Sequence, residues 1–298
     1  MGSPDLAAKI LAVLTDKFSI RGVVTQPDRP AGRGKVITPP PVKMLASQLG
    51  IPVIQPEKLR DPGVFERLEA WEPELIVVAA FGQILRPKVL DLPKFGCINV
   101  HASYLPRWRG AAPIQAAILN GDEFSGVTIM KMDPGIDTGP MLRQEKVQLD
   151  PDETLTTLTD KLATVGARLL LDTLPGYLDG SIQPIDQPAS GETYAPMLKK
   201  EDGLLDFNNS MVNIDRKVRA LNDWPGTFIF LNGQLLKIRK VSPLQGQSKQ
   251  ANMRAVIDKM PAISTPDGWV KLLEVQPAGK KWMSGADFLR GIQNWNTD

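Results

Sequence analysis

The chain has 298 residues, a net charge of +2, 42% hydrophobic residues and 23% charged residues. This length favours two domains over a single hydrophobic core, and the composition is typical of an ordinary globular protein. The sequence contains no run of about twenty apolar residues, which excludes a membrane-spanning segment, and no secretory leader is recognisable. A single cysteine, Cys97, excludes an internal disulfide and a thiolate metal cluster. We therefore expect a cytoplasmic protein.

Short β-branched apolar runs recur in the first half of the chain, at residues 20–25, 51–54, 74–80 and 97–100. Helical patterns over 4–14 and 42–49 lie between them. Continuous apolar strands that alternate with helices predict a Rossmann-like α/β domain with a mainly parallel sheet. Ligands of such sheets bind beyond the carboxyl ends of the strands.

The first predicted element of this domain is a helix. Ser3 followed by Pro4 predicts a helix start in which the Ser3 hydroxyl caps the first turn. Doubly wound sheets commonly place their first strand near the centre, and losing it would expose strand edges and an apolar face. We expect the first strand to be missing from this sequence and the natural start to lie upstream of Met1.

A long helical pattern over 154–178 closes the first half of the chain. The segment that follows, 179–200, is rich in Gly, Pro and Ser and lacks clear periodicity, as is typical of a linker. We therefore expect one domain over 1–178 and a second over 201–298.

The second domain carries strand and turn patterns. Residues 227–241 read as two strands joined by the dipeptide Asn232-Gly233, which is a strong hairpin signal. Further strands are predicted over 255–259 and 269–276, and a terminal helix has Ser284 as its cap. This pattern predicts a small β-barrel.

The only histidine, His101, ends an apolar run two residues after Asn99. Residues two apart in a strand face the same side, and an amide donor beside a titratable ring can polarise a carbonyl and move a proton. The alternative is a buried Asn beside a core histidine with satisfied hydrogen bonds, and the local spacing alone favours that alternative. Asp137 lies among turn-forming prolines and glycines, where a carboxylate bonds the backbone. If it reached His101, it would orient the ring and stabilise its protonated form.

Basic side chains gather in two places. The Pro- and Gly-rich segment after the first apolar run carries Arg29, Arg33, Lys35 and Lys43. It is either an exposed loop or a finger that contacts phosphates. The second group is Arg107 and Arg109 around Trp108, which can stack on a base or pack against the protein's own surface.

Four segments, taken together, resemble the methionyl-tRNA formyltransferase family in order and spacing. They are residues 25–35, 96–115, 126–141 and 275–289. Residues 96–115 and 126–141 are also similar to the wider family that transfers formyl groups from 10-formyltetrahydrofolate, including enzymes that act on amino sugars. The basic loop at 25–35 and the C-terminal domain point to the tRNA enzymes within it.

The resemblance implies roles for particular residues. The catalytic residues of the family match Asn99, His101 and Asp137. The segments that contact tetrahydrofolate match Ser103, Tyr104, Leu105 and Pro106, and also Phe81, Gly82, Gln83, Ile84 and Leu85. The loop that engages the tRNA matches Arg29, Arg33 and Lys35. The C-terminal domain is similar to an oligonucleotide-binding-fold barrel that holds the tRNA.

The implied activity is transfer of a formyl group from 10-formyltetrahydrofolate to the α-amino group of initiator methionyl-tRNA, for translation initiation. The resemblance implies a monomer without a metal. Two alternatives remain open: a formyltransferase for another amine such as a sugar nucleotide, and a catalytically silent tRNA-binding protein. A dinucleotide-dependent dehydrogenase is not favoured, because no G-x-G-x-x-G turn follows a predicted first strand.

Overall fold

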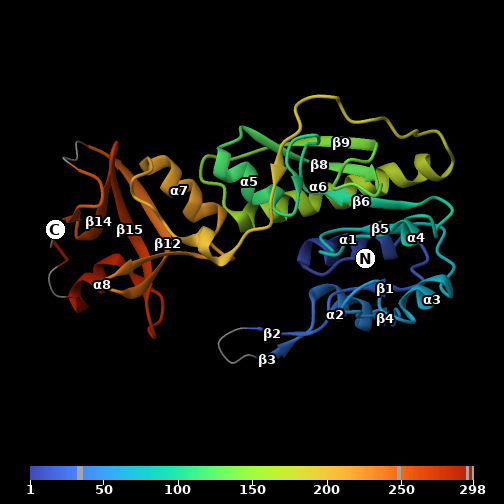
Figure 1. Cartoon of the computed structure of the whole chain (residues 1–298), viewed down its shortest axis with the longest axis horizontal. Helices are drawn as coiled ribbons and strands as arrows, with labels where there is room; N and C mark the ends of the chain where they lie inside the picture. The colour runs from blue at the N-terminus through green and yellow to red at the C-terminus, as the bar shows by residue number, and fades with distance from the viewer. Residues whose placement is uncertain (32–35, 247–249, 293–294, 297–298) are drawn as a thin grey trace. The chain divides into compact units, whose positions relative to one another are not determined.

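The computed structural model describes residues 1–31, 36–246, 250–292 and 295–296, and the chain divides into two compact units (Figure 1). The first comprises Met1–Pro113, Phe124–Gln148 and Thr159–Ala195; the second comprises Ile114–Glu123, Leu149–Leu158 and Pro196–Asp298. No helix in the described ranges combines the length and the apolar character needed to cross a membrane. The domain limits expected from the sequence stay a prediction.

The first unit contains the predicted α/β fold (Figure 1). Its four-stranded sheet has the order β5 (Ile76–Val78), β6 (Cys97–His101), β8 (Phe124–Lys131) and β9 (Met141–Gln148). β5 and β6 are parallel, whereas β8 runs antiparallel to both of its neighbours. A second, parallel pair is formed by β1 (Val23–Val24) and β4 (Val53–Ile54). The predicted strands are thus confirmed, although each is shorter than its apolar run, except β6.

The helices of this unit include α1 (Asp5–Thr15), α2 (Pro41–Gln48), α3 (Val64–Glu69), α4 (Pro87–Leu90) and most of α6 (Leu155–Leu178). α6 packs closely on the sheet, because a Cβ on Gly166 would lie 2.9 Å from Cγ1 of Val100 on β6. Short strands complete the unit: β2 (Arg29–Ala31) pairs with β3 (Val36–Thr38), and β7 (Arg109–Gly110) with β10 (Tyr194–Ala195).

The N-terminal residues lie between β1 and β5. The Gly2 amide donates to the Val24 carbonyl at 3.0 Å, and the Ala79 amide donates to the Met1 carbonyl at 2.9 Å. Gly2 and Ala79 form a single parallel bridge. Burial lowers the pKa of the Met1 amino group to about 6. Met1 and Gly2 therefore join the two groups of parallel strands at one point.

The expected exposure of an apolar face around this bridge is wrong. Val23, Val24 and Val78 are at most 5% exposed. The buried face of α1 consists of Leu6, Ala7, Ile10, Leu11 and Leu14. Several of these side chains line a cavity of about 40 Å³ together with Val23 and Val77. The helix therefore covers the strands, and only a small void remains.

The predicted Ser3 cap on α1 is also wrong. Pro4 occupies the N-cap position, and no side chain caps this helix end. The Ser3 hydroxyl oxygen instead accepts hydrogen bonds from the Thr25 hydroxyl and the Gln26 amide, both at 3.1 Å. A tertiary contact after β1 thus replaces the local cap, because the Ser3 hydroxyl can satisfy donors from either source.

The second unit contains an antiparallel sheet with the order β11 (Thr227–Leu231), β12 (Gln234–Gln245), β15 (Gly268–Pro277), β14 (Met260–Thr265) and β13 (Arg254–Ile257). β16 (Met283–Ser284) pairs with β15. The helices of this unit include α5 (Pro113–Asn120), η1 (Lys200–Gly203), α7 (Met211–Ala220) and α8 (Gly285–Gly291). This sheet corresponds to the expected C-terminal β domain.

Two local predictions in this unit are confirmed. Asn232 and Gly233 connect β11 to β12 and have positive φ angles of 49° and 75°, which is the conformation of the favoured two-residue hairpin. Ser284 caps α8 by accepting a hydrogen bond from the Asp287 amide at 3.1 Å. The sequence interpretation missed α7 and also β14, which contains Pro261.

Candidate active site

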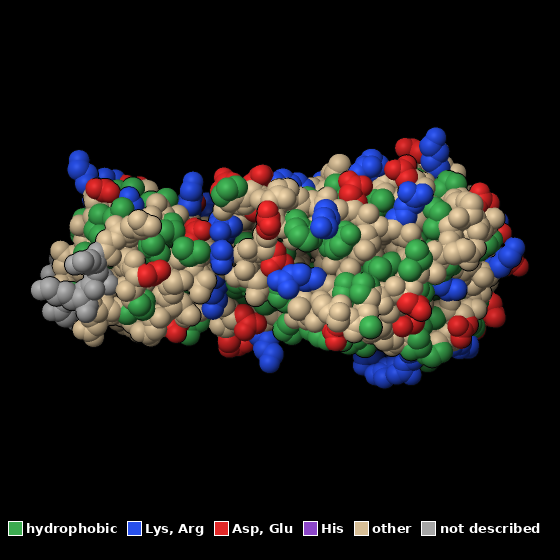
Figure 2. Space-filling view, turned by 90° about the horizontal axis from the view of Figure 1, so that it is seen from above, with side chains coloured by type: hydrophobic (Ala, Val, Ile, Leu, Met, Phe, Trp, Pro, Cys, Tyr) green, Lys and Arg blue, Asp and Glu red, His purple; other side chains and the backbone are tan. Residues whose placement is uncertain are grey.

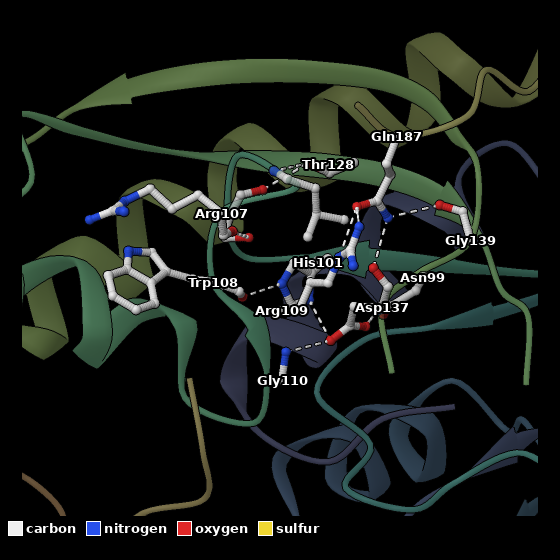
Figure 3. Close-up of polar contacts among 12 residues, drawn as sticks. Asn99, His101, Arg107, Trp108, Arg109, Gly110, Thr128, Asp137, Gly139 and Gln187 are labelled. Carbon is white, nitrogen blue, oxygen red and sulfur yellow. Dashed lines mark hydrogen bonds and ion pairs between the residues drawn. The ribbon is translucent and has the colours of Figure 1, made fainter. Parts of the chain in front are cut away.

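The candidate site is built at the carboxyl end of β6. Asn99 is paired with Val78 on β5, and His101 is paired with Thr128 on β8. Because the two residues are two positions apart, their side chains project from the same face of the strand, and both approach Asp137 (Figure 3). The sequence spacing alone could not show this convergence.

The Asp137 carboxylate is the meeting point of the site. Oδ1 accepts a hydrogen bond from Asn99 Nδ2 at 3.2 Å, and Oδ2 accepts one from the Gly110 amide at 2.8 Å. His101 Nδ1 lies 3.6 Å from Oδ2. Asp137 itself has a φ of 53°, a left-handed conformation that is uncommon for a residue other than glycine.

His101 has an oxygen atom facing each ring nitrogen. Nε2 lies 3.0 Å from the carbonyl oxygen of Trp108, which can only accept, and Nδ1 faces the Asp137 carboxylate (Figure 3). A neutral imidazole can donate from only one nitrogen, whereas the protonated ring donates from both. The His101 side chain is only 6% exposed, and no histidine is seen on the face in Figure 2. Both ring nitrogens therefore face acceptor oxygens, and the ring is shielded from solvent.

Gly110 is a position at which only glycine fits. Its φ is 112°, and a Cβ there would lie 2.6 Å from the carbonyl oxygen of Ala195. The absence of a side chain lets β7 lie against β10 while the Gly110 amide reaches Asp137.

The segment expected to contact folate through Ser103, Tyr104, Leu105 and Pro106 follows directly. The Ser103 hydroxyl donates to the Arg107 carbonyl at 2.6 Å, and Leu105 is 1% exposed. The Tyr104 ring meets Phe124 edge to face at 5.9 Å. Ser103 and Leu105 are therefore engaged within the protein.

Two polar residues that the sequence interpretation missed hold this segment. The Thr128 hydroxyl accepts from the Leu105 amide at 3.1 Å and donates to the Ser103 carbonyl at 2.8 Å. Gln144 Nε2 donates to the Leu105 carbonyl at 2.8 Å. Both residues lie in strands whose sequence has no feature that distinguishes them from other polar positions.

The second segment expected at the folate, Phe81 to Leu85, is divided between core and surface. Phe81 and Leu85 are each 3% exposed and belong to the apolar core of the unit. Gln83 accepts from the Leu59 amide at 2.8 Å. Gly82, Gln83 and Ile84 line a pocket of about 690 Å³. Gly82 and Ile84 are the exposed residues of this segment.

The basic residues behave differently from one another. Arg29 begins β2 and is 67% exposed, with its guanidinium 3.8 Å from Glu57. Lys43 pairs with Asp28 at 2.7 Å, and the Gln55 and Lys43 hydrogen bonds lower the pKa of the Asp28 carboxyl. Arg33 and Lys35 lie outside the described residues.

The Arg107 guanidinium lies 4.3 Å from the centroid of the Trp108 ring, so the protein itself supplies a stacking partner for this ring. The predicted inert packing of Cys97 is confirmed: the side chain is 1% exposed, and burial raises its pKa to about 12. Within the described part of the chain, no group of three or more His, Cys, Asp or Glu could hold a metal ion.

Two relatives illustrate what this chain is similar to. The methionyl-tRNA formyltransferase of Bacillus licheniformis is 48% identical over 296 residues, which cover 98% of this chain and 93% of that protein. The methionyl-tRNA formyltransferase of Myxococcus xanthus is 44% identical over 291 residues, with coverage of 98% and 93%.

A solved structure shares the fold. The N-formyltransferase of Helicobacter canadensis, in complex with folinic acid and dTDP-3-aminofucose, gives a TM-score of 0.66 at 20% identity, over 94% of this chain and 97% of that one. The formyl transferase family model matches residues 2–174, and the model of the formyl transferase C-terminal domain matches residues 197–293. The chain therefore belongs to the formyl transferase family.

Proposed function

We propose that this chain transfers a formyl group from 10-formyltetrahydrofolate to the α-amino group of initiator methionyl-tRNA. The observation that carries the proposal is the convergence of Asn99, His101 and Asp137 at the end of β6. Support for the substrate comes from the names of relatives that are 44% and 48% identical over nearly the whole chain. The structural neighbour at 20% identity is in complex with folinic acid, and that observation concerns that protein only.

Formyl transfer needs no strong base, but it needs a proton for the leaving group. An α-amine has a pKa near 8, so a useful fraction is neutral and nucleophilic at neutral pH. Attack on the formyl carbon places negative charge on the formyl oxygen, and the departing folate nitrogen must then receive a proton. The protein therefore has to stabilise an oxyanion and retain a proton close to the leaving group.

The three side chains can divide these tasks. Asn99 Nδ2 carries two hydrogens, and Asp137 occupies one of them, which leaves a donor for the formyl oxygen. The 3.6 Å separation of His101 Nδ1 from Asp137 is longer than a hydrogen bond. We assign this edge of the ring to the reacting groups, because catalytic contacts are often long before the substrate binds. Asp137 keeps the ring oriented.

The remaining assignments belong to the same proposal. The folate contacts residues 103–106 and the surface part of residues 81–85. Arg29, Arg33, Lys35 and the C-terminal domain contact the tRNA. The protein is a cytoplasmic monomer with domains over 1–178 and 201–298, and its reaction needs no metal.

The experiment is a formyl-transfer assay with radiolabelled 10-formyltetrahydrofolate. Purified protein is given methionyl-tRNA in one arm and a dTDP-linked amino sugar in the other, each with and without EDTA. We expect formylmethionyl-tRNA in the first arm, no transfer to the sugar and no effect of EDTA. Transfer to the sugar alone would support an amino-sugar enzyme. Binding of tRNA without any turnover would identify a silent tRNA-binding protein.

A further inference from the structure

Part of the predicted linker, residues 179–200, contacts the residues of the site. Residues Tyr194–Ala195 form β10, which runs parallel to β7 immediately after Trp108. The Thr193 hydroxyl accepts a hydrogen bond from the Trp108 amide, and the Thr193 carbonyl accepts one from the Arg109 amide, both at 2.8 Å. Trp108 is the residue whose carbonyl oxygen faces His101 Nε2. The linker thus holds one of the two partners of the imidazole.

The same segment also holds the other partner, through Gln187 (Figure 3). Gln187 Nε2 donates to the carbonyl oxygen of Asp137 at 2.7 Å and to that of Gly139 at 2.9 Å. Its Oε1 accepts from Arg109 Nε at 3.0 Å and from Arg109 Nη2 at 2.7 Å. One side chain therefore connects the turn that carries Asp137 to the strand that follows His101.

The orientation of the Gln187 amide follows from its partners. A guanidinium can only donate, so it must face the amide oxygen, and the two carbonyl oxygens can only accept, so they must face the amide nitrogen. All four contacts are satisfied in this orientation, and each would be opposed in the flipped one. Arg109 therefore fixes the orientation of the Gln187 amide, in which its nitrogen bonds the turn that carries Asp137.

The turn needs such support. Asp137 has a φ of 53°, and non-glycine residues hold this conformation where surrounding contacts over-determine it. Its carboxylate must also meet Asn99, the Gly110 amide and His101 at the same time. A small rotation of the Asp137 backbone would move the carboxylate away from the imidazole.

We propose that Gln187 is a positioning residue for the reaction: by bonding the Asp137 and Gly139 carbonyls, it fixes the Asp137 carboxylate against His101. This inference rests on the proposed function for its kinetic readout but not for its spectroscopic one. Gln187 lies outside every motif that the sequence interpretation singled out.

The test compares two substitutions at Gln187 with a matched control. Gln187→Ala removes all four contacts. Gln187→Glu keeps an acceptor for Arg109, and strengthens it, but places an oxygen against two carbonyl oxygens. Gln183→Ala is the control. Gln183 lies in the same segment, and its Nε2 donates to the nearby Gly180 carbonyl at 2.7 Å. If Gln187 acted only by supporting Arg109, Gln187→Glu would have little effect on kcat, because it keeps that contact.

We expect both Gln187 variants to lower kcat for formyl transfer by roughly tenfold to a hundredfold, as misplaced catalytic groups do, with KM within about twofold of the control. The second readout uses the fact that His101 is the only histidine. Its two ring nitrogens, labelled with ¹⁵N, report which of them carries a proton and its hydrogen bonding. We expect these resonances to shift in both Gln187 variants and to stay in place in the control.

Unchanged His101 resonances in either Gln187 variant overturn the proposal, and so does a kcat within twofold of the control. If the unaltered protein transfers no formyl group, the proposed function fails, and the ¹⁵N spectrum alone then decides the positioning role. Thermal unfolding of each variant accompanies both measurements. Should Gln187→Ala unfold, Gln187→Glu provides the decision, because it retains the Arg109 contact.

Discussion

The parallel strands of the first unit differ in how they are connected. β6 carries Asn99 and His101 and is paired on both sides, over three residues with β5 and over four with β8. β1 has only two residues. Met1 and Gly2 link it to the end of β5 through hydrogen bonds to Val24 and Ala79. The site thus occupies the well-connected strand, whereas the β1 side relies on α1 for cover. A substitution at the β6 site should therefore lower catalytic activity, whereas one on the β1 side should lower stability.

The largest effect is expected at the site. His101→Ala should lower formyl transfer by roughly a hundredfold or more, which is about 2.7 kcal/mol or more in the activation barrier. The reason is that no other imidazole exists in the chain to replace it. Steady-state kinetics with methionyl-tRNA measure the loss, and a cooperative thermal transition checks that the variant is folded. Near-normal turnover in a folded variant would remove His101 from the mechanism.

The second effect is expected at the bridge between β1 and β5. A Cβ on Gly2 would lie 2.5 Å from the Ala79 carbonyl oxygen and 2.5 Å from Ala7 Cβ. Gly2→Ala should therefore lower the free energy of unfolding by about 1 to 3 kcal/mol, as overpacking does. Urea denaturation measures this loss. Gly291→Ala is the control, because among the described residues no atom beyond its chain neighbours and its own helix backbone lies within 4 Å of the Cβ that would be added there.

kcat at a temperature where the Gly2→Ala variant is folded should stay within about twofold, since β6 keeps both of its pairings. A large loss of kcat with unchanged stability would show that the two sides of the unit are not separable. The comparison drawn above would then be wrong.

The smallest effect is a pH dependence at the start of β6. Burial raises the pKa of Cys97 from about 9 to about 12, so the folded state keeps the thiol proton that the unfolded chain loses first. The free energy of unfolding is therefore unaffected by Cys97 below pH 9 and falls above it, by about 1 kcal/mol at pH 10. Denaturation of the protein and of a Cys97→Ala variant at pH 8 and pH 10 isolates this contribution. If the free energy of unfolding changed equally between pH 8 and pH 10 in the two proteins, the Cys97 thiol would not be held neutral by the fold.

The sequence predicted most of the elements whose signal is local. The apolar runs became strands, the pattern over 154–178 became α6, and the dipeptide Asn232-Gly233 became a hairpin. These signals succeed because periodicity and turn conformation depend on neighbouring residues. The Ser3 cap failed for the opposite reason: its hydroxyl found donors at Thr25 and Gln26, which are distant in sequence.

The same division applies to the site. The sequence by itself determined which residue types were available, a lone His101 two positions after Asn99 and an Asp137 in a turn, and the family resemblance assigned roles to them. Only the tertiary structure decided that the Asp137 carboxylate meets both side chains, and that Gln187 and Thr193 secure the partners of the imidazole. The Asn99–Asp137, Asp137–Gln187 and Trp108–Thr193 contacts join residues 38, 50 and 85 positions apart. Local patterns carry no record of such pairings, because they form only when the chain folds.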